Sequence, residues 1–185
     1  GGHRGTEGGT EHAGAMGGSV FVTVGTTSFD ALISAVDRAE TARALAERGY
    51  TSATLQIGRG EYEPHETCPA CTGVPGFSVD YYRFKGSLAE DMASASLVVS
   101  HAGSGSIFEA LALKKPLVVV VNEALMDNHQ QELAGALASR GYLVSTTPAR
   151  LVSALETLDT SALKPYPGGD PAAVAQAVSG IVALA

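Results

Sequence analysis

The chain has 185 residues, of which 45% are hydrophobic, so it can form one folded domain with a sizeable core but leaves no room for a second large one. Its 12 Lys and Arg residues against 19 Asp and Glu give a net charge of −7, which argues against a nonspecific nucleic-acid partner and against broad adhesion to anionic lipid. The sequence lacks an apolar run of the roughly 20 residues that span a bilayer and the apolar core of a signal peptide, so the cytoplasm is the expected compartment.

Residues 1–18 are rich in glycine and offer almost nothing to bury, so we expect a disordered leader followed by a domain over residues 19–185. From Ser19 onward, apolar runs alternate with amphipathic ones, which predicts an α/β fold: a Rossmann-like parallel sheet with helices on both faces. In the first half the pattern predicts strands over 20–24, 53–57, 79–84 and 97–100, a helix over 28–48 that Gly49 ends, and a short helix opened by Ser87 with Glu90 as its capping partner.

The second half continues the alternation after a break at Lys114-Lys115-Pro116. Residues 117–121 are uniformly apolar and predict a central strand. The pattern then predicts a helix over 128–140, a strand over 142–145, a helix over 149–158 and a terminal helix over 171–183. That terminal helix is rich in Ala and Val, so core packing explains it as well as partner docking does.

Two cysteines, Cys68 and Cys71, form a CxxC pair with His65 nearby, which is compatible with half of a zinc site or with a redox pair. A structural zinc site needs four ligands, and the sequence has no second cysteine pair. Because Pro and Gly crowd this segment, a surface loop with ordinary thiols is the favoured interpretation, and no metal site is expected.

The most informative stretch is the turn after the fourth predicted strand, where small residues lead into a helix that carries one acid. Free backbone N–H groups at such a helix start favour a phosphate. Glu109 lies on the same face of the helix as the first turn, and helical side chains lean toward the N-terminus. Its carboxylate is therefore placed to accept hydrogen bonds from a ribose diol. The stretch 106–109 also fits a capping box, in which Glu109 would close onto its own helix start, and both interpretations stay open. The residues of this turn are His101, Gly103, Ser104, Gly105, Ser106 and Glu109.

Two further turns from strand to helix carry ligand-type side chains. After the first strand come Gly25, Thr26, Thr27 and Ser28; helix capping by Thr27 or Ser28 explains one hydroxyl but not all three. After the predicted central strand come Asn128, His129, Gln130 and Gln131, whose amides suit sugar hydroxyls but also suit a solvated helix terminus. Ligands bind at the carboxyl ends of the strands in such sheets, so the three turns together predict a nucleotide-sugar site.

These residues carry a resemblance that covers the chain from about Ser19 onward. The stretches 21–30, 55–60, 100–106 with Glu109, and 128–133 closely resemble the catalytic subunit of the eukaryotic UDP-N-acetylglucosamine transferase of the dolichol pathway. That family is similar to the C-terminal, donor-binding half of a GT-B glycosyltransferase. The resemblance implies transfer of GlcNAc from UDP-GlcNAc, the donor substrate, to GlcNAc-diphosphodolichol, with no further cofactor. The loop between Gly60 and Phe77 and the glycine-rich leader depart from the family pattern.

The resemblance also implies roles for individual residues and a second subunit. Glu109 would bind the ribose, the turn from Gly103 to Ser106 would face the diphosphate, the loop from Gly25 to Ser28 would lie near the donor phosphates, and Gln130 and Gln131 would face the GlcNAc. The general base is expected on a membrane-anchored partner that presents the dolichol-linked acceptor at the cytosolic face of the endoplasmic reticulum, so His101 and His129 are not expected to be bases. Two rival functions remain, a non-catalytic UDP-sugar-binding or regulatory subunit and a UDP-sugar epimerase-like protein, although one domain is short for an epimerase.

Overall fold

The computed structural model describes residues 17–65, 73–125 and 128–168. They form a six-stranded, entirely parallel sheet in the order β3-β2-β1-β4-β5-β6. The strands are β1 (Gly18–Thr23), β2 (Tyr50–Gln56), β3 (Ser78–Tyr82), β4 (Leu97–His101), β5 (Leu117–Val120) and β6 (Val144–Thr146). The helices are α1 (Asp30–Val36), α2 (Ala39–Glu47), α3 (Ala89–Ser94), α4 (Ser104–Ala112), α5 (Asn128–Ser139) and α6 (Leu151–Glu156), with two 3-10 turns, η1 (Pro148–Arg150) and η2 (Thr160–Ala162).

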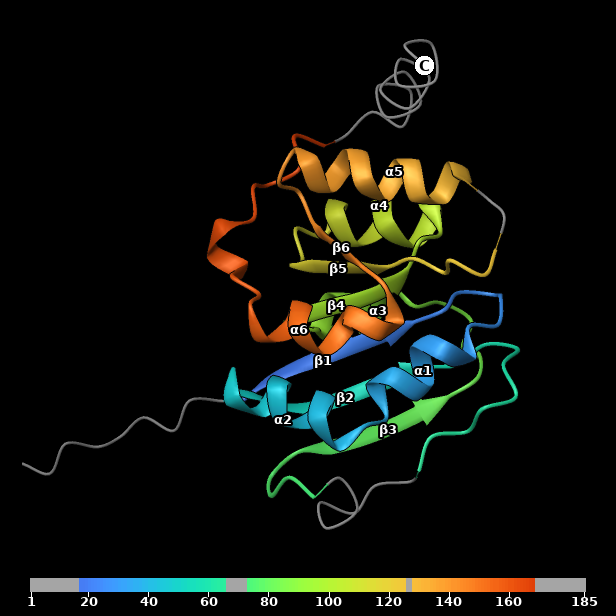
Figure 1. The fold of residues 1–185 in the computed structure, drawn as a ribbon, viewed down its shortest axis with the longest axis vertical. Helices are drawn as coiled ribbons and strands as arrows, with labels where there is room; N and C mark the ends of the chain where they lie inside the picture. Colours follow the sequence, from blue (N-terminus) through green and yellow to red (C-terminus); the bar gives the residue numbers. More distant parts are fainter. Residues whose placement is uncertain (1–16, 66–72, 126–127, 169–185) are drawn as a thin grey trace, which may run out of the picture.

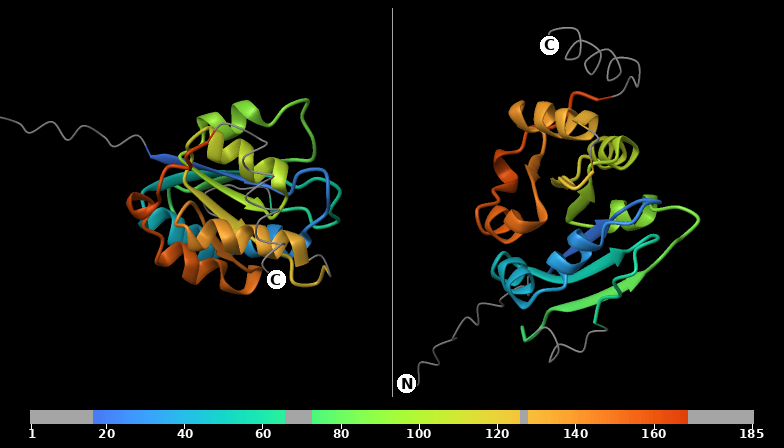
Figure 2. Two further views of the ribbon diagram at one scale, coloured as in Figure 1. Left: turned by 90° about the horizontal axis from the view of Figure 1, so that it is seen from above. Right: turned by 45° about the vertical axis from the view of Figure 1, so that its right-hand side comes forward.

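Helices cover both faces of the sheet, as predicted. One buried cluster joins the sheet to α1, α2 and α6, and a second joins it to α3, α4 and α5. Figure 2 shows α3 and α4, in green, on the opposite side of the sheet from α1 and α2, in blue and cyan. Strand β5 pairs with β4 on one side and β6 on the other, and all four of its side chains are fully buried, so the expectation of an interior strand is confirmed.

The single helix predicted over 28–48 is wrong, because the structure has two helices that break at Asp37 and Arg38. The Asp37 carboxylate accepts hydrogen bonds from the Tyr62 hydroxyl at 2.7 Å and from the His65 backbone N–H at 3.1 Å. In the same region the Thr41 hydroxyl donates to the carbonyl of Ala35 at 2.6 Å. Contacts with a loop distant in sequence therefore stabilise the break, and a local pattern cannot show them.

Smaller differences concern the ends of elements. Strand β2 begins earlier than predicted, β3 ends earlier, and the predicted helix over 149–158 is a 3-10 turn followed by α6. The Ser87 hydroxyl accepts a hydrogen bond from the N–H of Ala89, the first residue of α3, at 3.2 Å, so Ser87 caps the helix start as predicted. Glu90 makes no reciprocal bond to Ser87 in the described part of the chain, so the full capping box is not formed. Gly18 is already part of β1, two residues before the predicted strand start at Val20 and one before the predicted domain start at Ser19. The predicted leader up to residue 16, both cysteines and the helix over 171–183 lie outside the described residues.

The strand order reverses between β1 and β4, because β2 and β3 continue from one side of this pair and β5 and β6 from the other. In open parallel sheets this reversal leaves a place for a ligand at the carboxyl ends of the strands. The segments that follow β1, β2 and β5 lie together on the right of Figure 1. The order of the strands therefore favours a ligand site at this edge.

Candidate functional site

The structure brings the three predicted turns to one edge of the sheet. Thr23 pairs with Ser100 at the ends of β1 and β4, so the loop from Gly25 to Ser28 and the turn from Gly103 to Ser106 leave from neighbouring strands. Strand β5 lies beside β4, and α5, which follows it, begins with residues 128–131. The geometry thus places all the candidate residues at the carboxyl edge, around the point where the strand order reverses.

His101, the last residue of β4, packs between the two loops at the centre of this edge. A Cβ atom on Gly25 would lie 2.8 Å from Cε1 of His101, and one on Gly103 would lie 2.3 Å from its Nε2. Real Cβ atoms do not approach a ring so closely, so both positions require glycine while His101 is present. Position 25 has a second reason to be glycine, because its φ of +65° lies in the left-handed region.

The imidazole of His101 lies largely inside the protein. Burial lowers its pKa from the ordinary 6.5, and the backbone carbonyl of Thr23 acts in the opposite direction. The Nδ1 atom is buried and has no hydrogen-bond partner in the described part of the chain. His101 is therefore predominantly neutral at neutral pH and has the character of a packing residue beside the turn.

Helix α4 begins with unsatisfied donors. Gly103 is its N-cap and provides no side-chain cap, and the first backbone bond of the helix runs from the Ile107 N–H to the Gly103 carbonyl at 3.1 Å. The N–H groups of the preceding three residues therefore lack helical partners. Ser104 is exposed and Ser106 half-buried, and neither hydroxyl has a hydrogen bond among the described residues. A Cβ on Gly105 would meet no atom within 4 Å, so this helix start faces open space.

Glu109 lies in α4 but does not cap it. Since Gly103 is the N-cap, Ser106 is three residues inside the helix and cannot begin the capping box that the sequence allowed. The Glu109 side chain is exposed and makes no hydrogen bond or ion pair with the described residues. The capping interpretation is therefore wrong, and the carboxylate remains available to a ligand.

The loop after β1 is held by a buried polar pair that sequence reasoning missed. The Thr23 hydroxyl donates to Oε1 of Gln56 at 2.6 Å and accepts from the Gly25 N–H at 3.0 Å. The Gln56 amide nitrogen donates to the carbonyls of Gly25 and Arg83, both at 2.8 Å. Thr23 and Gln56 are 0% and 1% exposed. Both the N–H and the carbonyl of Gly25 are thus fixed by side chains from two strands, and a Gln inside an apolar strand was the available signal.

The remainder of this loop leaves two hydroxyls free. Thr27 Oγ1 donates back to the carbonyl of Val24 at 3.0 Å, and the Thr27 carbonyl accepts from the N–H of Arg59 at 3.0 Å. Phe29, without a side-chain hydrogen bond, is the N-cap of α1, so neither Thr27 nor Ser28 caps it and that alternative is wrong. Thr26 and Ser28 are exposed, and their hydroxyls have no partner in the described segments.

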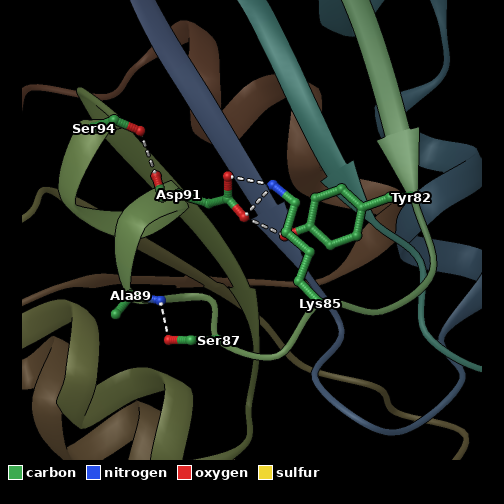
Figure 3. A network of polar contacts seen from close by, with 6 residues as sticks. All are labelled: Tyr82, Lys85, Ser87, Ala89, Asp91 and Ser94. Carbon is green, nitrogen blue, oxygen red and sulfur yellow. Dashed lines mark hydrogen bonds and ion pairs between the residues drawn. The ribbon is translucent and has the colours of Figure 1, made fainter.

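A second polar network supports the loop between β3 and α3 (Figure 3). The Tyr82 hydroxyl donates to Asp91 Oδ2 at 2.5 Å, and the Lys85 ammonium lies 2.9 and 3.0 Å from the two carboxylate oxygens and 4.3 Å from the centre of the Tyr82 ring. Burial raises the pKa of Asp91, but the hydrogen bonds from Tyr82 and Lys85 outweigh it and leave the value below normal. Arg83, between them, donates to the carbonyl of Gly60 at 2.7 Å, which ties this loop to the one after β2.

The third turn is more open than the other two. His129 and Gln131 are exposed at the start of α5, and Gln130 is half-buried. His129 Nδ1 lies 3.9 Å from Oε2 of Glu132, one turn along the helix. Asn128 is the first residue of α5, and its side chain is outside the described part. The side-chain amides of Gln130 and Gln131 thus lie at the start of α5, at the expected edge of the sheet.

The described residues provide neither a metal-ligand cluster nor a membrane span. Within 17–65, 73–125 and 128–168, no group of three His, Cys, Asp or Glu side chains could hold a metal ion. None of the helices in these ranges is both long and apolar enough to cross a membrane. His65, the predicted companion of the cysteines, instead places its Nδ1 2.8 Å from the Asp37 carboxylate.

Comparison with known sequences gives a consistent family. Residues 19–183 match the glycosyltransferase family 28 C-terminal domain. The human UDP-N-acetylglucosamine transferase subunit ALG13 is 51% identical over 128 residues, which are 69% of this chain and 11% of the human protein. The Saccharomyces cerevisiae protein of the same name is 33% identical over 178 residues, covering 80% of this chain and 88% of the yeast protein. The chain therefore spans about a tenth of its human relative but most of its yeast relative.

Comparison with solved structures gives the same fold. The NMR solution structure of ALG13 aligns with a TM-score of 0.67 and 29% identity, covering 90% of this chain and 98% of that one. The crystal structure of Acinetobacter baumannii MurG aligns with a TM-score of 0.61 over 90% of this chain and 50% of that one, at 19% identity, which is evidence for the fold alone.

Proposed function

The chain belongs to the family of the glycosyltransferase family 28 C-terminal domain and of the ALG13 subunits of UDP-N-acetylglucosamine transferase, and we propose that it binds UDP-GlcNAc as the donor half of a transferase. The observation that carries the proposal is the uncapped start of α4 where the strand order reverses. Free N–H groups, the serine hydroxyls and the helix dipole there favour a diphosphate, and Glu109 has no partner within the protein.

Each part of the edge has a role in this proposal. The turn from Gly103 to Ser106 binds the diphosphate and, as the bond to the sugar breaks, stabilises the charge that develops on the leaving UDP. Glu109 accepts hydrogen bonds from the two ribose hydroxyls. The Thr26 and Ser28 hydroxyls approach the donor phosphates, and Gln130 and Gln131 bind hydroxyls of the GlcNAc. His101 stays neutral and positions the two loops rather than moving a proton.

The acceptor side belongs to another protein in this proposal. Two observations support this: the relatives are named as subunits, and the fold of this chain aligns with only 50% of the MurG chain. We infer that a membrane-anchored partner carries the general base and presents GlcNAc-diphosphodolichol, so that the second GlcNAc is added at the cytosolic face of the endoplasmic reticulum. The sugar nucleotide alone would then bind to this chain without turnover.

Two measurements test the proposal separately. Calorimetric titration of the chain with UDP-GlcNAc, with GDP-mannose as the control nucleotide sugar, tests donor binding; selective binding of UDP-GlcNAc is expected. Transfer of radiolabelled GlcNAc to a GlcNAc-diphospholipid, with and without a co-expressed membrane subunit, tests the division of labour. Activity of the chain alone would overturn the split site, and donor binding without any transfer in the presence of the partner would favour a regulatory subunit.

A further inference from the structure

A basic pocket lies at the opposite end of the sheet from the candidate donor site. Its volume is about 160 Å³, and it is formed where α4 ends, where β5 begins and where the chain passes η2. The chain has only four lysines, and three of them line this pocket: Lys114, Lys115 and Lys164. In a protein with a net charge of −7 this is a strong local concentration of positive charge.

The three lysines differ in whether their ammonium groups have a hydrogen-bond partner. Lys115 donates to the carbonyl of Ala93 at 2.5 Å, which anchors it to the end of α3. Lys114 and Lys164 are exposed and have no side-chain hydrogen bond or ion pair with the described residues. The nearby carboxylate of Asp159, next to Thr160 of the pocket, is engaged by the backbone N–H and hydroxyl of Ser161 at 3.0 and 2.6 Å. Two cations at the rim therefore have no ion-pair partner among the described residues.

Lys114 is also in a backbone conformation that lysine rarely adopts. Its φ is +55°, and it is the one non-glycine residue of the described ranges with a positive φ. The N–H groups of Lys114 and Lys115 bond to the carbonyls of Leu111 and Ala110 at 3.0 and 3.1 Å, which is the helix ending that normally has glycine at this position. Gly141 has that position at the end of α5, with a φ of +81°. A cation thus occupies a glycine position at the rim of the pocket.

Helix ends alone do not account for this charge. The C-termini of α4 and α5 each carry roughly half a negative charge, which nearby cations stabilise. Arg140 at the end of α5 is close enough to Tyr166 to oppose the rise in its pKa that burial and Tyr142 cause. With Arg140 and the three lysines set against two helix ends and the Asp159 carboxylate, about two positive charges remain. That surplus is available to an anion.

The lining of the pocket suits a phosphate group. Thr160, Tyr142 and Tyr166, which carry hydroxyl groups, line the pocket together with the lysines, and Tyr142 and Tyr166 meet edge to face with ring centres 5.2 Å apart. Lysine binds phosphate as a point charge and does not require the planar geometry that arginine does. We propose that this pocket is a second anion site, which binds a phosphate group from a soluble phosphate compound or from a phospholipid headgroup.

The test uses the full chain labelled with ¹⁵N and titrated with inorganic phosphate at constant ionic strength, with chloride as the compensating ion. We expect saturable shifts of the amides of Lys114, Lys115, Tyr142 and Lys164, separate from any shifts at Gly103 to Ser106. Lys114→Gly and Lys164→Gln should each weaken this binding about two- to fivefold. Lys85→Gln, which removes the same charge at the other end of the sheet, should not change it. If the donor-site proposal failed, phosphate would still shift these four amides and only the shifts at Gly103 to Ser106 would be missing, so the two outcomes are distinguishable.

Lys114→Gly also separates an effect on phosphate binding from an effect on protein stability, because glycine adopts the positive φ at this position without strain. Its melting temperature should equal or exceed that of the wild type while phosphate binding falls. Co-sedimentation with phosphatidylcholine vesicles, with and without phosphatidic acid, distinguishes the sources: retention that is lost in the lysine variants indicates the headgroup, and binding of free phosphate alone indicates a soluble compound. Shifts no larger than with chloride, or equal shifts in the lysine variants, would overturn the proposal and leave the lysines as partners of the helix ends.

Discussion

The Nε2 atom of His101 lies where a side chain on Gly103 would have to begin, 2.3 Å from the position of its Cβ. A Cβ on Gly25 would meet the same edge of the imidazole, 2.8 Å from Cε1 and 3.1 Å from Nε2. One ring therefore sets the spacing between the loop after β1 and the start of α4, the two segments to which we assign the donor phosphates. Glycine at these positions is a requirement of packing as well as of ligand access.

Gly103→Ala and Gly105→Ala should have opposite effects. The first places a methyl group against His101 and should destabilise the fold by about 1–3 kcal/mol, as overpacking does. The second adds a methyl group in open space and should stabilise the helix by up to about 1 kcal/mol while weakening UDP-GlcNAc binding. Urea unfolding and calorimetric titration check both. Equal stability losses in the two variants would contradict the packing role of His101.

His101 should make stability fall on mild acidification. Because burial lowers its pKa in the folded state, the unfolded chain binds the proton first once the pH drops below 6.5. Stability is therefore complete above that pH and is lost below it, with a slope of at most about 1.4 kcal/mol per pH unit. Unfolding of the wild type and of His101→Gln between pH 5 and 8 isolates the effect. Parallel curves would show that His101 does not titrate in this range.

Glu109→Ala should weaken UDP-GlcNAc binding by about tenfold to a hundredfold, the usual loss for a charged hydrogen-bond acceptor. Its melting temperature should change by less than about 2 °C, because the carboxylate is exposed and caps nothing. Glu90→Ala, at an exposed glutamate of α3, is the matched control. A lower melting temperature with unchanged donor affinity would restore a purely structural role for Glu109.

Gln56→Leu should cost about 2–4 kcal/mol of unfolding free energy, since it leaves the carbonyls of Gly25 and Arg83 and the buried Thr23 hydroxyl without their partner. Thr23→Val should cost less, and the double variant should cost less than the sum of the two, because both residues belong to one network. Chemical unfolding of the four proteins measures this. Strict additivity would mean that the pair does not act together.

Tyr82→Phe should destabilise the protein by about 1–2 kcal/mol through loss of the hydrogen bond to Asp91. Tyr81→Phe, at the neighbouring residue of β3, should change stability by less than about 0.5 kcal/mol. Burial, the Asp91 hydrogen bond and the Asp91 charge raise the pKa of Tyr82, so its contribution is present below pH 10 and is lost above it as the unfolded tyrosine ionises. Thermal melts at pH 7 and pH 10.5 test both points.

Much of the fold was predictable because its signals are local. The apolar runs at β1, β4 and β5 and the glycine that ends α5 indicate elements without reference to the rest of the chain. The edge that carries the candidate site also follows from the order of strands and turns. The break between α1 and α2 was not predictable, since Asp37 is held by Tyr62 and His65 from a distant loop.

By itself, the sequence determined the α/β class, the position of the three turns and the family, because each depends on short stretches whose chemistry is visible in order. Only the tertiary structure decided that Ser106 and Glu109 form no capping box, that Gln56 holds Gly25 and that His101 separates two glycines. It also brought Lys164 to Lys114 and Lys115 across 50 residues of chain. The physical reason is the same in each case: these contacts join residues that only the pairing of strands and the packing of helices bring within a few ångströms of one another.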